Sequence, residues 1–95
     1  MRENSEFDKR DILNSFAKRI PNIRKELHMS QTELGKKLGI SRQSISSIER
    51  GTVPLTWDTF LALLMVIMVS DEAMYKELTA DKELEGAIEE LKRRE

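Results

Sequence analysis

Arg42 and Gln43 carry the side chains best suited to recognising another molecule. A guanidinium can donate two hydrogen bonds to the edge of guanine, and a carboxamide can pair in the same two-point way with adenine. Both residues directly follow Ser41, a residue type that caps helix N-termini. The pair is therefore predicted to lie in the first turn of a helix, with chemistry suited to base edges.

Two short helices, 31–38 and 42–50, must position this pair. Ser30 precedes the first helix, and Glu33 follows at the spacing of a capping box. Gly39 has the residue type that ends helices in a left-handed turn. A short joint that contains glycine is typical of a helix-turn-helix.

An apolar seam is predicted to hold the two helices together. Gly35 is small enough to let them approach closely, and Gly51 is expected to end the second helix. The seam residues are Leu34, Leu38, Ile40, Ile45 and Ile48.

Helical patterns continue on both sides of this pair. Apolar residues recur at helical spacing from Asp11, and Pro21 predicts a kink or a new helix start. Thr56 is expected to cap a fourth helix, 57–69, and Ser70 to cap a fifth that ends near Leu78. A last helix is expected from Asp81, and whether 71–94 forms one helix or two stays open.

These patterns predict an all-α, compact helical bundle. The expected organisation is a flexible N-terminus (1–10), a helix-turn-helix domain (11–69) and a C-terminal helical extension (70–95). The length of 95 residues suits one small domain, and 5% aromatic residues favour helices over a β-sandwich.

The net charge of −1 hides an asymmetry. Residues 16–52 carry a net charge of +5, whereas residues 53–95 carry −5. A basic region around the helix-turn-helix fits contact with phosphates, and the acidic half is expected to face elsewhere.

Composition argues against other classes of function. The chain has no Cys and a single histidine, His28, so we expect no catalytic site, metal or cofactor, and not an enzyme. The polar N-terminus lacks a signal-peptide pattern. The apolar run 60–69 is about half as long as a membrane span, so we expect a cytoplasmic protein without membrane contact.

From Phe16 to about Val69 the chain resembles the Cro/CI-type (XRE) helix-turn-helix family of phage repressors. The resemblance implies a lambda-repressor-like fold, double-stranded DNA as partner, and helix 42–50 in the major groove. The implied base contacts are Arg42, Gln43, Ser46 and Ser47. The motifs that carry it are Ile23–Glu26, Ser30–Leu34, Leu38–Ile45 and Ile48–Gly51.

The resemblance also implies contacts to the DNA backbone and one structural ion pair. Arg24 and Glu49 match the positions of that ion pair. The connector 52–56 carries no charge, although it is often basic in the family, so we expect few phosphate contacts and more dependence on dimerisation. The implied phosphate contacts are Gln31, Ser44, Thr52, Lys36, Lys37 and Arg50.

The fourth helix is apolar all round from 60 to 69, which a surface helix should not be. Ala62, Met65 and Val69 mark its expected outer face, and such a patch needs a cover. Either a second subunit or the C-terminal helices can supply it, and both alternatives stay open. The C-terminal residues that would do so include Leu84, Ile88 and Leu91.

The sequence thus predicts a sequence-specific DNA-binding transcription regulator. We expect a homodimeric repressor that reads an inverted-repeat operator with helix 42–50. The alternative is an antitoxin-like or partner-controlled module whose acidic C-terminal helices bind another protein.

Overall fold

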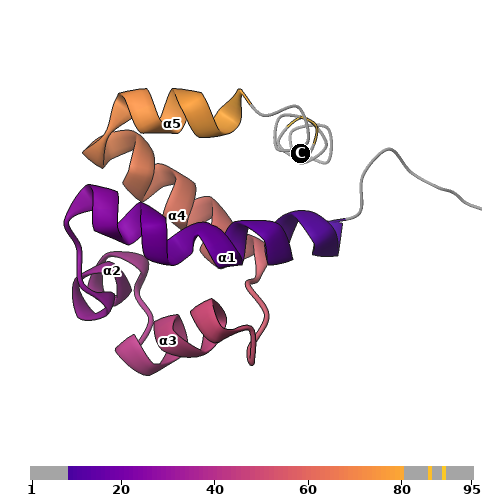
Figure 1. The fold of residues 1–95 in the computed structure, drawn as a ribbon, viewed down its shortest axis with the longest axis vertical. Coiled ribbons are helices and arrows are strands. Elements are labelled where there is room, and N and C mark those ends of the chain that lie inside the picture. Colours follow the sequence, from indigo (N-terminus) through magenta and orange to yellow (C-terminus); the bar gives the residue numbers. More distant parts are fainter. Residues whose placement is uncertain (1–8, 81–85, 87–88, 90–95) are drawn as a thin grey trace, which may run out of the picture.

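The computed structural model describes residues 9–80, together with Gly86 and Glu89. Residues 9–80 form five α-helices, without a β-strand among the described residues. The predicted all-α fold is therefore confirmed. In Figure 1 the first helix crosses in front of the fourth, with the second and third below and the fifth above. The helices are α1 (Lys9–Leu27), α2 (Gln31–Leu38), α3 (Arg42–Arg50), α4 (Trp57–Ser70) and α5 (Glu72–Thr79).

Helix α1 continues through Pro21, so a new helix start at this proline is wrong. The proline lacks one backbone donor, but Ile20 and Ile23 on either side of it are buried and hold both halves of the helix on the same core. The helix also begins at Lys9 rather than Asp11. Of the predicted flexible N-terminus, residues 1–8 lie outside the described residues.

Helices α2 and α3 have the bounds that their capping residues predict. The Ser30 Oγ accepts a hydrogen bond from the Glu33 N–H at 3.0 Å, and the Glu33 carboxylate accepts one from the Ser30 N–H at 2.8 Å. This second bond is the main reason why the pKa of Glu33 is lowered from its ordinary value. Ser41 caps α3, and Gly39 ends α2 with a φ of 78°.

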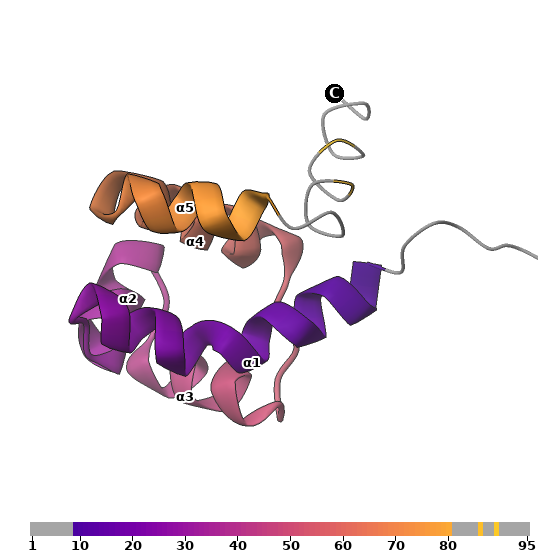
Figure 2. The ribbon, with the colours of Figure 1, turned by 45° about the horizontal axis from the view of Figure 1, so that its top comes forward.

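Helix α4 forms the centre of the hydrophobic core. Phe60, Leu63 and Ile67 are fully buried on one side of it. The Phe60 ring forms T-shaped pairs with the rings of Phe16 on α1 and of Trp57, with ring centroids 5.0 and 5.3 Å apart. Figure 2 shows the helices from a second direction, with α5 over α4 at the top and α3 below α1. This core is the base on which α2 and α3 rest.

Helix α5 starts one residue later than predicted, because Asp71 caps it in place of Ser70. The Asp71 N–H donates to the Ile67 carbonyl at 2.8 Å, and its carboxylate accepts from the Met74 N–H at 3.1 Å. Ser70 remains the last residue of α4. The buried Met74 attaches α5 to the core. The predicted helix from Asp81, with Leu84, Ile88 and Leu91, lies outside the described residues.

Candidate nucleic-acid interface

The joint between α2 and α3 depends on a very close approach of backbone atoms. A Cβ atom on Gly35 would lie 2.7 Å from the Ile40 carbonyl oxygen. Leu34, Ile45 and Ile48 are buried next to this contact, and Leu38 and Ile40 are half-buried. The two helices therefore form a tightly packed unit whose outer side is polar.

The four predicted base contacts lie along α3 and differ in exposure. Arg42 and Gln43 are exposed in the first turn, whereas Ser46 and Ser47 are half-buried one turn later. The Ser46 Oγ accepts a hydrogen bond from the Arg50 guanidinium at 3.2 Å. The Ser47 carbonyl accepts two bonds from Thr52, one from its N–H at 3.0 Å and one from its hydroxyl at 3.2 Å. Of these four residues, the two with long exposed side chains, Arg42 and Gln43, are thus at the N-terminus of α3.

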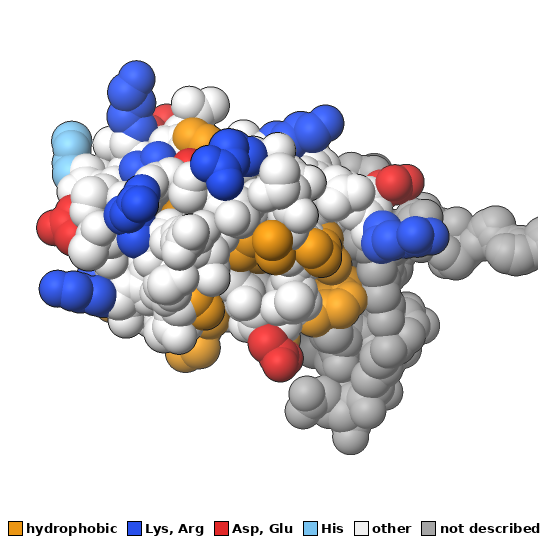
Figure 3. Space-filling model, turned by 90° about the horizontal axis from the view of Figure 1, so that it is seen from below, with side chains coloured by type: hydrophobic (Ala, Val, Ile, Leu, Met, Phe, Trp, Pro, Cys, Tyr) orange, Lys and Arg blue, Asp and Glu red, His pale blue; other side chains and the backbone are white. Residues whose placement is uncertain are grey.

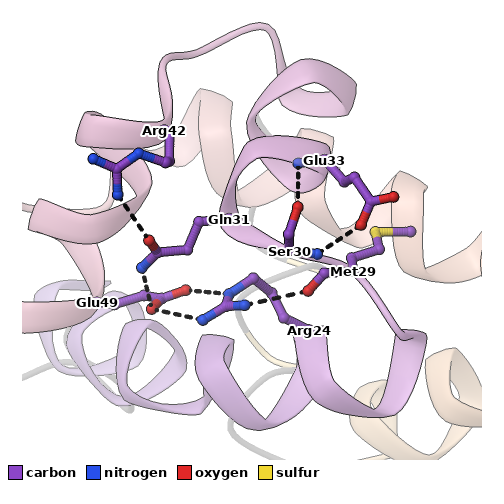
Figure 4. Close-up of polar contacts among 7 residues, drawn as sticks. All are labelled: Arg24, Met29, Ser30, Gln31, Glu33, Arg42 and Glu49. Carbon is purple, nitrogen blue, oxygen red and sulfur yellow. Dashed lines mark hydrogen bonds and ion pairs between the residues drawn. The ribbon is translucent and has the colours of Figure 1, made fainter.

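A chain of polar contacts connects α1, α2 and α3 (Figure 4). The Arg24 guanidinium donates to both Glu49 carboxylate oxygens, at 2.6 and 3.2 Å. The Arg24 and Glu49 side chains are 19% and 8% exposed. Arg24 also donates to the Met29 carbonyl at 3.2 Å. This ion pair joins the end of α1 to the end of α3 and is largely shielded from water.

Gln31 extends this chain of contacts to the exposed end of α3. Its carboxamide NH₂ donates to Glu49 at 3.0 Å, and its carboxamide oxygen accepts from Arg42 at 3.3 Å (Figure 4). The implied phosphate contact at Gln31 therefore has two internal partners in the free protein. One N–H of its NH₂ group is still available to a phosphate oxygen, because the group has two donors. Sequence reasoning missed the link to Arg42, since nothing in a linear pattern pairs residues 31 and 42.

The other implied phosphate contacts surround this centre. Lys36, Lys37, Arg50 and Thr52 are exposed, and the Ser44 hydroxyl is within 3.0 Å of the Ser41 hydroxyl. Figure 3 views the molecule from the α3 side and shows Lys and Arg side chains mainly along the upper and left parts of this face, with hydrophobic side chains in its centre and below. The positive charge is thus concentrated on part of this surface.

The predicted cover face of α4 is partly exposed. Met65 is 62% and Val69 80% exposed, whereas Ala62 is half-buried. Leu61 and Met68, each 40% exposed, share this surface and were not singled out from the sequence. Their spacing from Met65, of four and three residues, could have identified them.

The described residues contain neither a metal-binding cluster nor a membrane-spanning helix. No cluster of three metal-binding side chains occurs among the residues that the structure describes. In the same part of the chain, every helix is too short or too polar to cross a bilayer.

Comparison with models of protein families gives a match over the central part of this chain. The model of a helix-turn-helix family matches residues 22–70, just over half of the 95 residues. The match includes the last turns of α1 and all of α2, α3 and α4. Comparisons with curated proteins and with solved structures give no match.

Proposed function

Because the chain belongs to the XRE-type (Cro/CI-like) helix-turn-helix family of DNA-binding transcription regulators, we propose that it recognises a specific sequence in double-stranded DNA. In this proposal α3 enters the major groove with its N-terminal turn toward the bases. Arg42 pairs with a guanine and Gln43 with an adenine. Ser46 and Ser47 contact base edges with their shorter side chains.

The observation that carries this proposal is the hydrogen bond between Arg42 and Gln31. An exposed arginine normally samples many conformations, and fixing it on binding costs free energy. Here Gln31 itself is held by Glu49, which is held by Arg24. The guanidinium has five N–H donors, so one bond to Gln31 leaves enough for a two-point contact with guanine. The free protein therefore restricts Arg42 before DNA arrives.

Phosphate contacts in this proposal come from both sides of α3. Gln31, Lys36 and Lys37 approach from α2, whereas Ser44, Arg50 and Thr52 belong to α3 and the residues after it. The connector 52–56 supplies no charge. Binding strength should therefore fall less steeply with salt than for a protein with a basic connector, because fewer counterions are released.

The regulator is proposed to act as a homodimeric repressor on an inverted repeat. A single α3 contacts only a few base pairs, and two copies related by a two-fold axis read two half-sites about 34–36 Å apart. A dimer bound in this way covers its site and can exclude other proteins from it.

Selection of bound DNA from a random pool, followed by titration of the selected site, tests the proposal. Arg42→Ala should weaken binding to the selected site by about 5- to 150-fold, the equivalent of about 1–3 kcal/mol for a two-point base contact. The loss on random DNA should be much smaller. Lys36→Ala, a matched control on α2, should weaken both to a similar small extent.

Two results would contradict the proposal. Equal losses for Arg42→Ala on selected and random DNA would assign Arg42 to a phosphate rather than a base. Failure of the wild-type protein to enrich any sequence would rule out specific recognition.

A further inference from the structure

Four large apolar side chains on α4 face water in the monomer. Leu61, Met65, Met68 and Val69, which we call the α4 stripe, are between 40% and 80% exposed. Leu61, Met68 and Val69 each lie three or four residues from Met65, which places all four along one side of the helix. Exposed apolar side chains grouped in this way typically mark a contact surface.

Helix α5 does not cover the α4 stripe, although it packs against α4. Its buried Met74 and half-buried Tyr75 and Leu78 lie against the core, and the α4 stripe stays exposed. From Thr59 to Ser70, α4 has no charged side chain. A surface without charge can meet an identical copy of itself without repulsion between like charges, which a two-fold interface requires.

A hollow of about 280 Å³ lies beside the α4 stripe. Its lining consists of Lys37 from α2 and Met65, Val66, Val69 and Ser70 from α4. Val69, at 80% exposure the most exposed residue of the stripe, therefore projects next to a space large enough for a side chain. A projection and a hollow side by side are what a self-complementary surface needs, because each copy can insert its projection into the hollow of the other.

We propose that the α4 stripe and this hollow form the interface with a second copy of the chain. Val69 of each copy enters the hollow of the other, and the Lys37 stem closes the edge while its ammonium stays outside the interface, where it can still contact a phosphate. A specific interface buries roughly 800 Å² per partner, so the rim of the hollow must contribute along with the four stripe residues. The biological role of this dimer rests on the proposed function. Lys37 belongs to α2, so the interface borders the DNA-binding unit.

The molar mass in solution, measured by light scattering, tests the interface. The wild-type protein should have twice the mass of the chain, and Met65→Lys should have the mass of one chain, because the interface would bury two unpaired ammonium groups. Val53→Lys is the matched control, since Val53 is also an exposed apolar residue, at 44%, but lies outside α4. It should remain a dimer. Circular dichroism checks that each variant is folded.

Cross-linking provides a second test, which the absence of native cysteine makes specific. Val69→Cys should form a disulfide-linked dimer under mild oxidation, because the two copies of residue 69 lie near the two-fold axis. A disulfide requires Cα atoms within about 7 Å of each other. Val53→Cys should remain a single chain under the same conditions.

Several outcomes would overturn the interface. They are a monomeric wild type, a dimeric Met65→Lys variant, and equal cross-linking of Val69→Cys and Val53→Cys. A partner of another kind on the α4 stripe would give the first of these.

DNA binding separates this failure from failure of the proposed function. Met65→Lys should bind a single half-site as tightly as the wild type, but lose the added affinity for the full site. A monomer that still enriches a DNA sequence contradicts the interface alone, whereas a dimer that enriches none contradicts the proposed function alone.

Discussion

Helices α3 and α4 present opposite kinds of surface to water. The exposed residues of α3 include Arg42 and Gln43, whereas those of α4 include Met65 and Val69. Water solvates the first surface well, so α3 is stable uncovered and can exchange water for DNA when DNA is present. The second surface has an unfavourable free energy in water at all times, and only burial removes it. A polar surface therefore suits a contact that forms and breaks, whereas an apolar surface suits a contact that lasts.

The two helices also differ in what attaches them to the rest of the molecule. Helix α3 is attached to the core by two buried side chains, Ile45 and Ile48. Its C-terminal end is also joined to α1 and α2 through Glu49. Helix α4 relies on its buried face, with Phe60, Leu63 and Ile67 at its centre. The stability of the helix-turn-helix unit should therefore depend on a few polar atoms. The stability of α4 should depend on the volume of its buried side chains.

The largest effect is expected from breaking the shielded ion pair. Arg24→Met should lower the free energy of unfolding by about 3–5 kcal/mol, because it leaves the Glu49 carboxylate without its cationic partner. Urea denaturation measures this loss. Adding Glu49→Leu should recover part of it, since the unpaired charge is then removed as well. If the double variant loses as much free energy of unfolding as the two single variants together, the polar network does not hold α3.

A smaller effect should follow from a change of backbone geometry at the end of α2. Gly39 has a φ of 78°, where a Cβ atom is unfavourable. Gly39→Ala should therefore cost about 1 kcal/mol. Gly39→Asn should cost less, because asparagine tolerates this conformation. Thermal unfolding of the two variants checks the order, and equal stability of the Ala variant and the wild type would contradict it.

The smallest effect concerns pH and the exposed capping box. Hydrogen bonds from Ser30 lower the pKa of Glu33 in the folded protein, so the ionised form is favoured by folding. Its contribution to stability is complete above the ordinary Glu pKa and is lost as the pH falls through the lowered folded value. Glu33→Gln should remove this part of the acid dependence and slightly lower stability at neutral pH, because the amide can still accept the Ser30 N–H bond but carries no charge. An identical acid profile for the two proteins would contradict the role of the carboxylate.

Local signals and long-range contacts differ in how well the sequence predicts them. The bounds of α2 and α3 follow from Ser30, Ser41 and Gly39, since caps act within a few residues. The effect of Pro21 on α1 depends on burial at both sides of it, and the sequence does not reveal that burial. The same reasoning explains the cap of α5, where Ser70 and Asp71 are equally plausible until the path of the chain is known.

The candidate site shows the same division. The residue types at Arg42 and Gln43 indicate their chemistry directly. The partner of Arg42 could not be predicted, because Gln31 reaches it only after two helices pack. On α4, the spacing of Leu61 and Met68 from Met65 points to them, but a helix that is apolar all round does not show how wide its exposed side is.

Asp71 ends α4 and begins α5 with a single side chain and a single N–H, so the two helices are joined without a spacer. Helix α5 should consequently rotate together with α4 as one rigid body. A fluorophore attached at position 79, at the end of α5, should report the tumbling time of the whole domain rather than local wobble. Fluorescence anisotropy from that one label would then follow both pairing of chains and capture of DNA, without a probe on either surface.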